Sequence, residues 1–272
     1  HYKKNSCLYH IYILYQVKKL EAPIFSLSLK ADFLPEYYVQ NYSSFTGIAN
    51  VSKIVNYKIL NQTGKGKASN IISALKEVLK NKETSHIVSV CLSVGSLGTD
   101  FSGVNTVIDE VCNNGTSVVI AVGNYGTLNT KTLNSLGKNK NAIVVGAVND
   151  RDEVTSYSSK GSTLSGDVIK PDLVAPGGSN LAQYRSIISG ARGANITTVG
   201  YGTSISAAIV SAAINVLIEA KWGDWNQWNA INTTKFSKVL KSILLMTATE
   251  TNLNRADDPT TELNEGANEY AP

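Results

Sequence analysis

Three short runs of apolar, mostly β-branched residues constrain the fold of this chain more than any other feature. They cover residues 86–93 (HIVSVCLS), 117–122 (SVVIAV) and 142–148 (AIVVGAV). Runs with so little alternation between apolar and polar residues are typical of strands that are buried on both faces. Because helical stretches separate the runs, the pattern predicts a parallel sheet flanked by helices. The expected fold class is therefore α/β, with a doubly wound, mainly parallel sheet.

The same patterns predict further elements. We expect a strand over residues 54–60 and helices over 68–80, 104–113, 204–221 and 235–247. The first 45 residues differ from the rest, because they are rich in Tyr and contain no strand–helix–strand unit. Only residues 8–17 there have the composition of a strand. We therefore expect an atypical N-terminal segment or insertion over residues 1–45 and one α/β domain over 46–272.

Composition and charge narrow the classes of partner. The net charge of +4 is spread along the chain, and its densest basic stretch, residues 64–67, has no interleaved aromatic residues. We interpret that stretch as a solvated loop and expect no nucleic-acid partner. Because no run of 18 apolar residues occurs, we also expect no membrane-spanning helix.

The three cysteines, Cys7, Cys91 and Cys112, are too few and too scattered for a disulfide framework or a zinc site. Cys91 and Cys112 stand in apolar segments, so we expect them to be buried, inert thiols.

The two ends of the sequence suggest a part of a longer chain. Residue 1 is His and not Met, no signal peptide follows it, and the last residues follow a polar stretch without a closing element. We interpret the chain as truncated at both ends. Six Asn-x-Ser/Thr sequons fit a secreted, glycosylated surface without proving one. They begin at Asn41, Asn50, Asn61, Asn114, Asn195 and Asn232.

The sharpest chemical feature is a serine at the start of the helix predicted over residues 204–221. Gly202-Thr203-Ser204 leads into a run of small and apolar residues. A helix start supplies unpaired backbone N–H groups and a positive dipole end, and both stabilise negative charge on an oxygen bound beside Ser204. Ser is also a common N-cap residue, so this motif alone favours a structural role.

A second polar residue, Asn124, lies two residues after the strand predicted over residues 117–122. In open α/β sheets, ligands bind at the carboxyl ends of the strands. A side-chain amide at that place can donate a hydrogen bond to an oxyanion. The alternative is that Asn124 is simply a turn residue in a Gly-rich loop.

Together the two motifs resemble those of the subtilases, the subtilisin-like serine proteases. The family's nucleophile motif is Gly-Thr-Ser-Met-Ala, and its oxyanion loop is Ala-Gly-Asn. Further segments resemble family segments in the same order, and they cover residues 46–60, 88–94, 144–161 and 169–177. The resemblance covers about residues 46–250 and implies the three-layer subtilisin-like fold.

The resemblance also implies roles for individual residues. Ser204 would be the nucleophile that forms an acyl-enzyme, and Asn124 would hold the oxyanion together with the Ser204 backbone N–H. The substrate would be a polypeptide in extended conformation that pairs with residues 92–96. Structural calcium and an extracellular or cell-surface location are further implications of the family, although no ligands for calcium can be named. The expected substrate-binding residues are Leu92, Ser93, Val94, Gly95, Ser96, Gly123, Gly202 and Thr203.

The chain also departs from the family pattern. The family's base lies in a His-Gly-Thr-His motif and its orienting carboxylate in an Asp-Thr/Ser-Gly motif, and neither motif is recognisable here. His1, His10 and His86 lack the required neighbours, and Asp32 follows His10 although the family order is Asp before His. We therefore predict that no His of this chain reaches Ser204.

Four smaller departures lie close to the two motifs. Ser206, Ala208 and Ile209 replace the family's Ala, Pro and His after the nucleophile, and Ser93 replaces a Gly. Each departure slightly weakens the expectation of full activity.

Two other classes of protein share parts of these motifs. An α/β-hydrolase requires Gly-x-Ser-x-Gly, and the chain has Ser206 at the second glycine. The remaining alternative is a catalytically inactive subtilase-like module that binds peptides or acts as a scaffold. For either function we predict that Ser204 and Asn124 lie on the same rim of one parallel sheet.

Overall fold

The computed structural model describes residues 10–15, 47–50, 52–61, 63–97, 101–128, 133–162, 169–179, 186–190, 197–222 and 235–249. Its helices are α1 (Ala68–Ser85), α2 (Ser102–Asn113), α3 (Thr203–Trp222), α5 (Phe236–Thr247) and the 3₁₀ helix η2 (Ser135–Lys138). Its longer strands are β1 (His10–Tyr15), β2 (Lys53–Lys58), β3 (Ile87–Leu92), β4 (Ser117–Ala121) and β5 (Ile143–Val148). Its shorter strands are β6 (Gly161–Ser162), β7 (Ile169–Lys170), β8 (Leu173–Pro176), β9 (Ile187–Gly190) and β10 (Thr197–Gly200).

Within these ranges, six strands form the main sheet in the order β2-β1-β3-β4-β5-β8. Strands β3, β4, β5 and β8 pair in parallel. Strand β1 is antiparallel to both of its neighbours, so β2 runs in the same direction as β3. The mainly parallel sheet expected from the sequence is confirmed.

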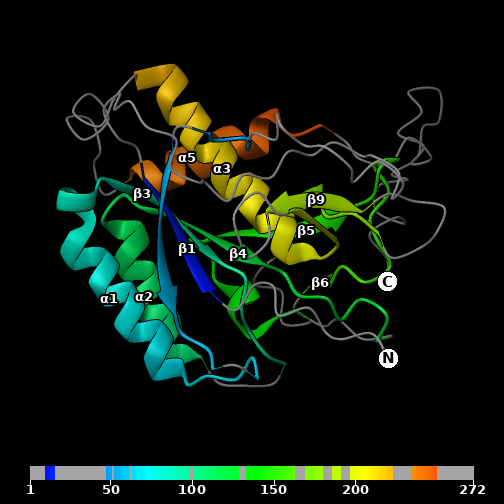
Figure 1. The fold of residues 1–272 in the computed structure, drawn as a ribbon, viewed down its shortest axis with the longest axis horizontal. Helices are drawn as coiled ribbons and strands as arrows, with labels where there is room; N and C mark the ends of the chain where they lie inside the picture. The colour runs from blue at the N-terminus through cyan, green and yellow to red at the C-terminus, as the bar shows by residue number, and fades with distance from the viewer. Residues whose placement is uncertain are drawn as a thin grey trace.

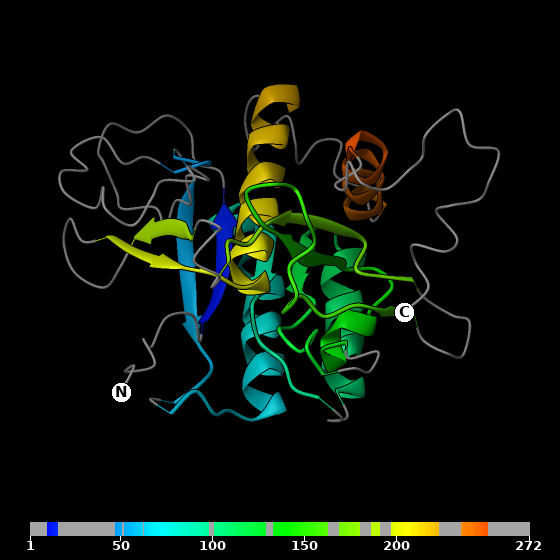
Figure 2. The ribbon, with the colours of Figure 1, turned by 90° about the vertical axis from the view of Figure 1, so that its right-hand side faces the viewer.

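Helices cover both faces of this sheet, as Figure 1 and the perpendicular view in Figure 2 show: α1 and α2 lie on one side, and α3 and α5 on the other. The side chains of β4 alternate between the two layers. Val118 and Ile120 join the core under α1 and α2, whereas Val119 and Ala121 join the core under α3. This division explains the unbroken apolar runs, because every position along such a strand meets a helix layer.

The predicted elements are close to the observed ones. The helix expected over residues 68–80 continues to Ser85, where His86 takes a left-handed conformation with a φ of 51° and ends it. The other predicted helices and strands match within about two residues at most ends. The two-stranded pairs β6–β7 and β9–β10 were not predicted, because strands of two to four residues have no measurable periodicity.

Strand β1 comes from the N-terminal segment and lies between β2 and β3. The sequence predicts a strand at this place in the chain, but it does not predict the antiparallel direction. The N-terminal segment thus contributes a strand to the main sheet of the α/β domain.

Helix α3 is long and apolar enough, from Thr203 to Lys221, to cross a membrane by length and composition. Such a helix was not expected, because polar residues interrupt its apolar run. More than half of this stretch (56%) is buried inside the protein, and Ala207, Ile214 and Ile218 pack against the sheet. We interpret α3 as the central helix of the core.

Candidate active site

The start of α3 is held over the end of β8 by hydrogen bonds. The Gly202 N–H donates to the Gly177 carbonyl oxygen (2.8 Å), and Ser206 Oγ donates to the Ala175 carbonyl oxygen (3.0 Å). The segment that resembles the family's Lys-Pro-Asp…Ala-Pro-Gly stretch therefore positions Ser204, which lies partly exposed in the first turn of α3.

Asn124 lies beside this helix start, because β4 ends at Ala121 and the chain turns at Gly123, whose φ is +112°. Asn124 Oδ1 accepts hydrogen bonds from the Thr203 backbone N–H (3.0 Å) and from Thr203 Oγ1 (2.8 Å). The Gly123 N–H donates to the same hydroxyl group (3.3 Å). Both side-chain bonds of Asn124 use its oxygen. Its Nδ2 has no hydrogen-bond partner in the described part of the chain and can donate to a ligand.

These contacts bring the two predicted residues together. Asn124 follows the carboxyl end of β4, and its side chain holds the residue that directly precedes Ser204. A Cβ atom on Gly202 would lie 3.2 Å from Asn124 Nδ2, so the missing side chain of Gly202 keeps the space beside this nitrogen open. Ser204 and Asn124 therefore share one rim of the sheet.

A turn after β5 forms hydrogen bonds with the loop that contains Asn124. Ser159 Oγ accepts a hydrogen bond from the Tyr125 N–H (3.0 Å), and the Ser159 N–H donates to the Gly123 carbonyl oxygen (2.9 Å). Tyr157 in the same turn donates to the carbonyl oxygens of Gly177 (2.9 Å) and Gly178 (2.7 Å). Burial raises the pKa of Tyr157 to about 12, so its hydroxyl remains a donor at neutral pH.

The segment predicted to bind substrate leaves the end of β3 at Leu92. Its carbonyl oxygens at Val94 and Ser96 are occupied by a neighbouring segment: Asn134 Nδ2 donates to Val94 (2.9 Å), and Ser135 donates to Ser96 through its N–H (3.0 Å) and its hydroxyl (2.7 Å). Successive carbonyl groups of an extended chain point to opposite sides. The N–H and C=O of Gly95 therefore face away from residues 134–135.

Gly95 is exposed, and neither its N–H nor its C=O has a hydrogen-bond partner among the residues that the structure describes. An unpaired backbone edge of this kind can bind an extended peptide as an additional strand. This edge starts next to Ser204, because Ser93 Oγ donates to the Ser204 carbonyl oxygen (3.1 Å).

Three of the departures from the family pattern have structural roles. The hydroxyl groups of Ser93 and Ser206 each make one of the hydrogen bonds that hold the start of α3. Ile209 is buried in the core under α3. These substitutions fit the packing of this chain, so they do not themselves argue against a working site.

A base for Ser204 is not found in the described ranges. Within them, no imidazole or carboxylate forms a hydrogen bond with Ser204 Oγ. His86 precedes β3 and so lies at the opposite edge of the sheet from Ser204. The pairing of Ile11 with Leu92 places the backbone of His10 at the carboxyl end of β3, but its side chain lies outside the described part of the structure, as do His1 and Asp32. For these residues the prediction stays a prediction.

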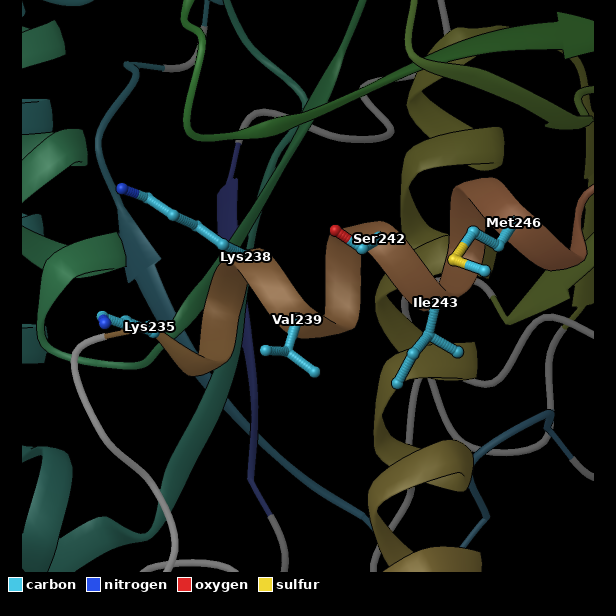
Figure 3. A pocket seen from close by; sticks show the side chains of 6 residues that line it. All are labelled: Lys235, Lys238, Val239, Ser242, Ile243 and Met246. Carbon is cyan, nitrogen blue, oxygen red and sulfur yellow. The ribbon is translucent and has the colours of Figure 1, made fainter.

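A shallow hollow elsewhere on the protein contains none of the predicted catalytic residues. All six side chains that line it come from α5 and the residue before it (Figure 3). They are Lys235, Lys238, Val239, Ser242, Ile243 and Met246. Lys241 of the same helix binds at the amino end of β5, so this hollow lies away from the Ser204 rim.

Structural calcium, implied by the resemblance, is not supported by the side chains that the structure describes. Among them, no group of three or more His, Cys, Asp and Glu residues could hold a metal ion.

Comparisons with known proteins show which family the chain is similar to. The model of the subtilase family matches residues 37–266. A subtilisin from Bacillus pumilus is 31% identical over 140 residues, which are 51% of this chain and 46% of the relative. A subtilisin-like protease 2 from Pseudogymnoascus destructans is 33% identical over 133 residues, or 48% of this chain and 30% of the relative. A cuticle-degrading serine protease from Arthrobotrys oligospora is 29% identical over 131 residues, or 48% and 29%.

Two solved structures share the fold. A cold-adapted subtilisin-like serine proteinase superposes with a TM-score of 0.52 at 20% identity, covering 75% of this chain and 62% of that protein. Sphericase superposes with a TM-score of 0.57 at 22% identity, covering 71% and 59%.

The chain belongs to the subtilase family, as its motifs predicted. The matches span less than half the length of these curated relatives.

Proposed function

We propose that the chain carries the nucleophile and oxyanion half of a subtilisin-type serine endopeptidase. Ser204 Oγ attacks the carbonyl carbon of a peptide bond, and an acyl-enzyme forms as the amine leaves. The observation that carries the proposal is the pair of hydrogen bonds from Thr203 to Asn124 Oδ1. They leave the Asn124 amide N–H groups as donors on the rim where Ser204 begins a helix.

The oxyanion site follows from the same contacts. The first N–H groups of a helix have no partner within the helix, and the helix dipole places positive potential there. The Ser204 N–H and Asn124 Nδ2 would both donate to the negatively charged oxygen of the tetrahedral intermediate. Because Thr203 fixes Asn124 before substrate arrives, this stabilisation requires little reorganisation during the reaction.

The substrate is an extended polypeptide lying along residues 92–96. It would pair with the N–H and C=O of Gly95. These two groups point to the opposite side from the carbonyl groups of Val94 and Ser96, which already accept hydrogen bonds. Main-chain pairing of this kind binds many sequences, because it does not depend on the substrate's side chains.

A neutral serine hydroxyl is a weak nucleophile and needs a base. General-base assistance is typically worth about 10²–10⁴ in rate. In subtilisin itself, a member of this family, loss of the His costs roughly 10⁶ in turnover, a value taken over from that enzyme. The 272-residue chain alone should therefore hydrolyse ordinary peptide bonds at a negligible rate.

An activated ester tests the proposal without requiring the base. A peptidyl p-nitrophenyl ester has a good leaving group, so the chain should release a slow stoichiometric burst of p-nitrophenol and gain one acyl group on Ser204. Ser204→Ala should abolish both. Ser211→Ala, a buried serine on the same helix, should leave the burst unchanged. The proposal fails if acylation occurs to the same extent in Ser204→Ala.

The inactive peptide-binding module remains the second candidate, and the lack of a base among the described residues favours it. The same assay distinguishes the two functions. A module would bind an extended peptide but show no acylation of Ser204 by the activated ester, and Ser204→Ala would bind the peptide as the unmodified chain does.

We also propose an extracellular or cell-surface location. One relative is named as cuticle-degrading, which implies a substrate outside the cell that makes it. The asparagines of three sequons, Asn50, Asn61 and Asn114, are exposed in the structure, as glycosylation would require. Mass spectrometry of the protein secreted by its native host would test this location.

A further inference from the structure

We propose that Asn134 is a positioning residue that holds the two walls of the peptide cleft at a fixed separation. The first wall is residues 94–96, which would pair with substrate. The second wall is residues 121–124, which end in the oxyanion donor Asn124. This inference rests on the proposed function, because it assigns Asn134 to the same peptide-binding site.

The side-chain amide of Asn134 bridges the two walls directly. Its Nδ2 donates one hydrogen bond to the Val94 carbonyl oxygen (2.9 Å) and another to the Ala121 carbonyl oxygen (3.1 Å). Ala121 is the last residue of β4, and Val94 lies two residues past the end of the neighbouring parallel strand β3. One NH₂ group thus sets the distance between the walls just beyond the last ladder hydrogen bonds.

The remaining polar groups of Asn134 fix the amide itself. Its backbone N–H donates to the Val122 carbonyl oxygen (2.8 Å), and its Oδ1 accepts from the Leu136 N–H (3.1 Å). Asn134 is 3% exposed, so water does not compete for these bonds. A buried amide with all four of these bonds made is rigid, and replacing it leaves carbonyl oxygens of both walls unpaired.

The fit of Gly95 against this side chain shows how closely the first wall approaches it. A Cβ atom on Gly95 would lie 1.7 Å from Asn134 Oδ1, far inside van der Waals contact. The Asn134 amide therefore occupies the space that a side chain at position 95 would need. The unpaired N–H and C=O of Gly95 are fixed in space by Asn134 beneath them.

Asn134 transmits this position to the chemistry through the second wall. Val122, which binds the Asn134 N–H, is two residues before Asn124. A change in the amide would shift the substrate-pairing edge relative to the oxyanion donor. The resulting variant would bind peptides less tightly and acylate more slowly, although none of the groups that contact the reacting carbonyl would be altered.

A matched pair of variants tests this role in the 272-residue chain. Asn139 is also buried, accepts from the N–H two residues later at its Oδ1, and donates to two acceptors through its Nδ2. It differs in lying at the amino end of β5. Asn134→Ser and Asn139→Ser therefore remove equivalent side-chain amides from the two edges of the sheet.

Two measurements are compared across these variants. The first is hydrogen exchange followed by mass spectrometry on peptides that cover residues 94–97 and 122–125. The second is the Kd of an extended tetrapeptide with a free C-terminal carboxylate, together with the rate of acylation by the peptidyl ester. Asn134→Ser should raise exchange in both walls together by about tenfold or more and raise the Kd by a similar factor. Asn139→Ser should change neither.

Two further variants separate hydrogen bonding from volume and from folding. Asn134→Asp keeps the volume but removes both donors, so it should loosen both walls as Asn134→Ser does. Ser135→Ala removes only the hydroxyl bond to Ser96 and should loosen the first wall alone, which provides a milder test if Asn134→Ser folds poorly.

The outcomes distinguish this inference from the proposed function. If the unmodified chain neither binds the peptide nor reacts with the ester, the proposed function fails, and the positioning role fails with it. If the unmodified chain does bind, but Asn134→Ser leaves the Kd unchanged or alters exchange in only one wall, the positioning role alone is wrong.

Discussion

The amino and carboxyl edges of the main sheet arrange polar groups in opposite ways. At the amino edge, the largely buried side chains of Lys170 and Asp172 pair with each other. At the carboxyl edge, several donors and acceptors are held in place without a partner among the described residues. Because unpaired polar groups are tolerated where they meet water or a ligand, the exposed Asn124 amide and Gly95 backbone remain available to a binding partner.

The amino edge is organised around Asp172. Its carboxylate accepts from Lys170 Nζ (2.5 Å), from Lys241 Nζ (2.9 Å) and from the Val144 N–H (2.8 Å). Lys241 also donates to the Ala142 carbonyl oxygen (2.8 Å), which ties α5 to the start of β5. The side chain of Lys170 is only 1% exposed, so this cluster is a structural one closed to ligands.

The carboxyl edge is organised around groups that face outward. Thr203 and Asn134 orient the Asn124 amide and the Gly95 backbone, yet both of these leave hydrogen-bonding capacity unused. The Asp172 cluster is thus paired internally, whereas Asn124 and Gly95 keep unpaired groups. Variants at the two edges should therefore separate stability from function.

The largest expected effect is on stability at the amino edge. Asp172→Asn removes the only carboxylate in contact with the buried Lys170 among the described residues. Breaking a buried ion pair by removing one partner typically costs about 3–5 kcal/mol. We expect a loss of this size in the free energy of unfolding, measured by urea denaturation.

The control for this variant is Asp152→Asn, an exposed carboxylate in the turn after β5, which should change stability little. Acylation by the peptidyl ester, measured at a temperature where Asp172→Asn is folded, should be unchanged. A large loss of acylation per folded molecule would contradict the separation of the two edges.

The second effect concerns the oxyanion donor. Asn124→Leu keeps the size of the side chain but removes its amide. For the corresponding donor of subtilisin, the measured loss is about 10²–10³ in turnover, and we adopt that value from the family member. The rate constant of ester acylation should fall by this factor, with a smaller change in peptide Kd.

Asn113→Leu, an exposed asparagine at the end of α2, provides the matched control and should acylate normally. If Asn124→Leu retains more than about a tenth of the rate, Asn124 is a turn residue and not an oxyanion donor.

A third, smaller effect tests how Asn124 is oriented. Thr203→Val removes the hydroxyl that donates to Asn124 Oδ1 and accepts from the Gly123 N–H, but it keeps the backbone N–H bond at 3.0 Å. One neutral hydrogen bond is worth about 0.5–1.5 kcal/mol, so the loss of two should lower the acylation rate by roughly five- to a hundredfold. Thr203→Ser should restore the rate. A loss as large as that of Asn124→Leu would show instead that the Thr203 hydroxyl contacts the oxyanion itself.

Much of the fold and part of the site followed from local sequence. The strands β3, β4 and β5 were predicted because every position in them is apolar or small, a pattern that only a doubly covered sheet requires. The sequence predicts Ser204 at the start of a helix and Asn124 just past the end of a strand, and the resemblance of the two motifs to those of the subtilases implied one shared site.

The parts that were missed depend on contacts between distant segments. Asn134 has no local motif that separates it from other loop asparagines, and its role appears only when Val94 and Ala121 are neighbours in space. The direction of β1 is decided by which strands it pairs with. The two hydroxyl groups at Ser93 and Ser206 looked like losses against the family pattern, yet each makes a hydrogen bond that a glycine or alanine cannot make.

The smallest expected effect is a pH dependence that arises at the amino edge. Burial lowers the pKa of Lys170 to about 8, although Asp172 opposes the shift, whereas an unfolded lysine has a value of 10.5. The unfolded chain therefore binds more protons above pH 8, so this group makes the protein more stable as pH rises from 8 towards 10.5. Burial raises the pKa of Cys91 and of Cys112 from 9.0 to about 12, so the thiols lower stability as pH rises above 9.

Between pH 8 and 9 the Lys170 contribution should therefore dominate among these groups, with a slope of at most about 1.4 kcal/mol per pH unit. Urea denaturation at intervals across this window should show stability rising with pH in the unmodified chain, and the rise should vanish in Lys170→Met. Lys160→Met, which removes an exposed lysine, should keep it. Because the carboxyl edge has no part in this titration, the tetrapeptide Kd of Lys170→Met should match that of the unmodified chain at each pH. A slope that persists in Lys170→Met would show that it does not originate from Lys170.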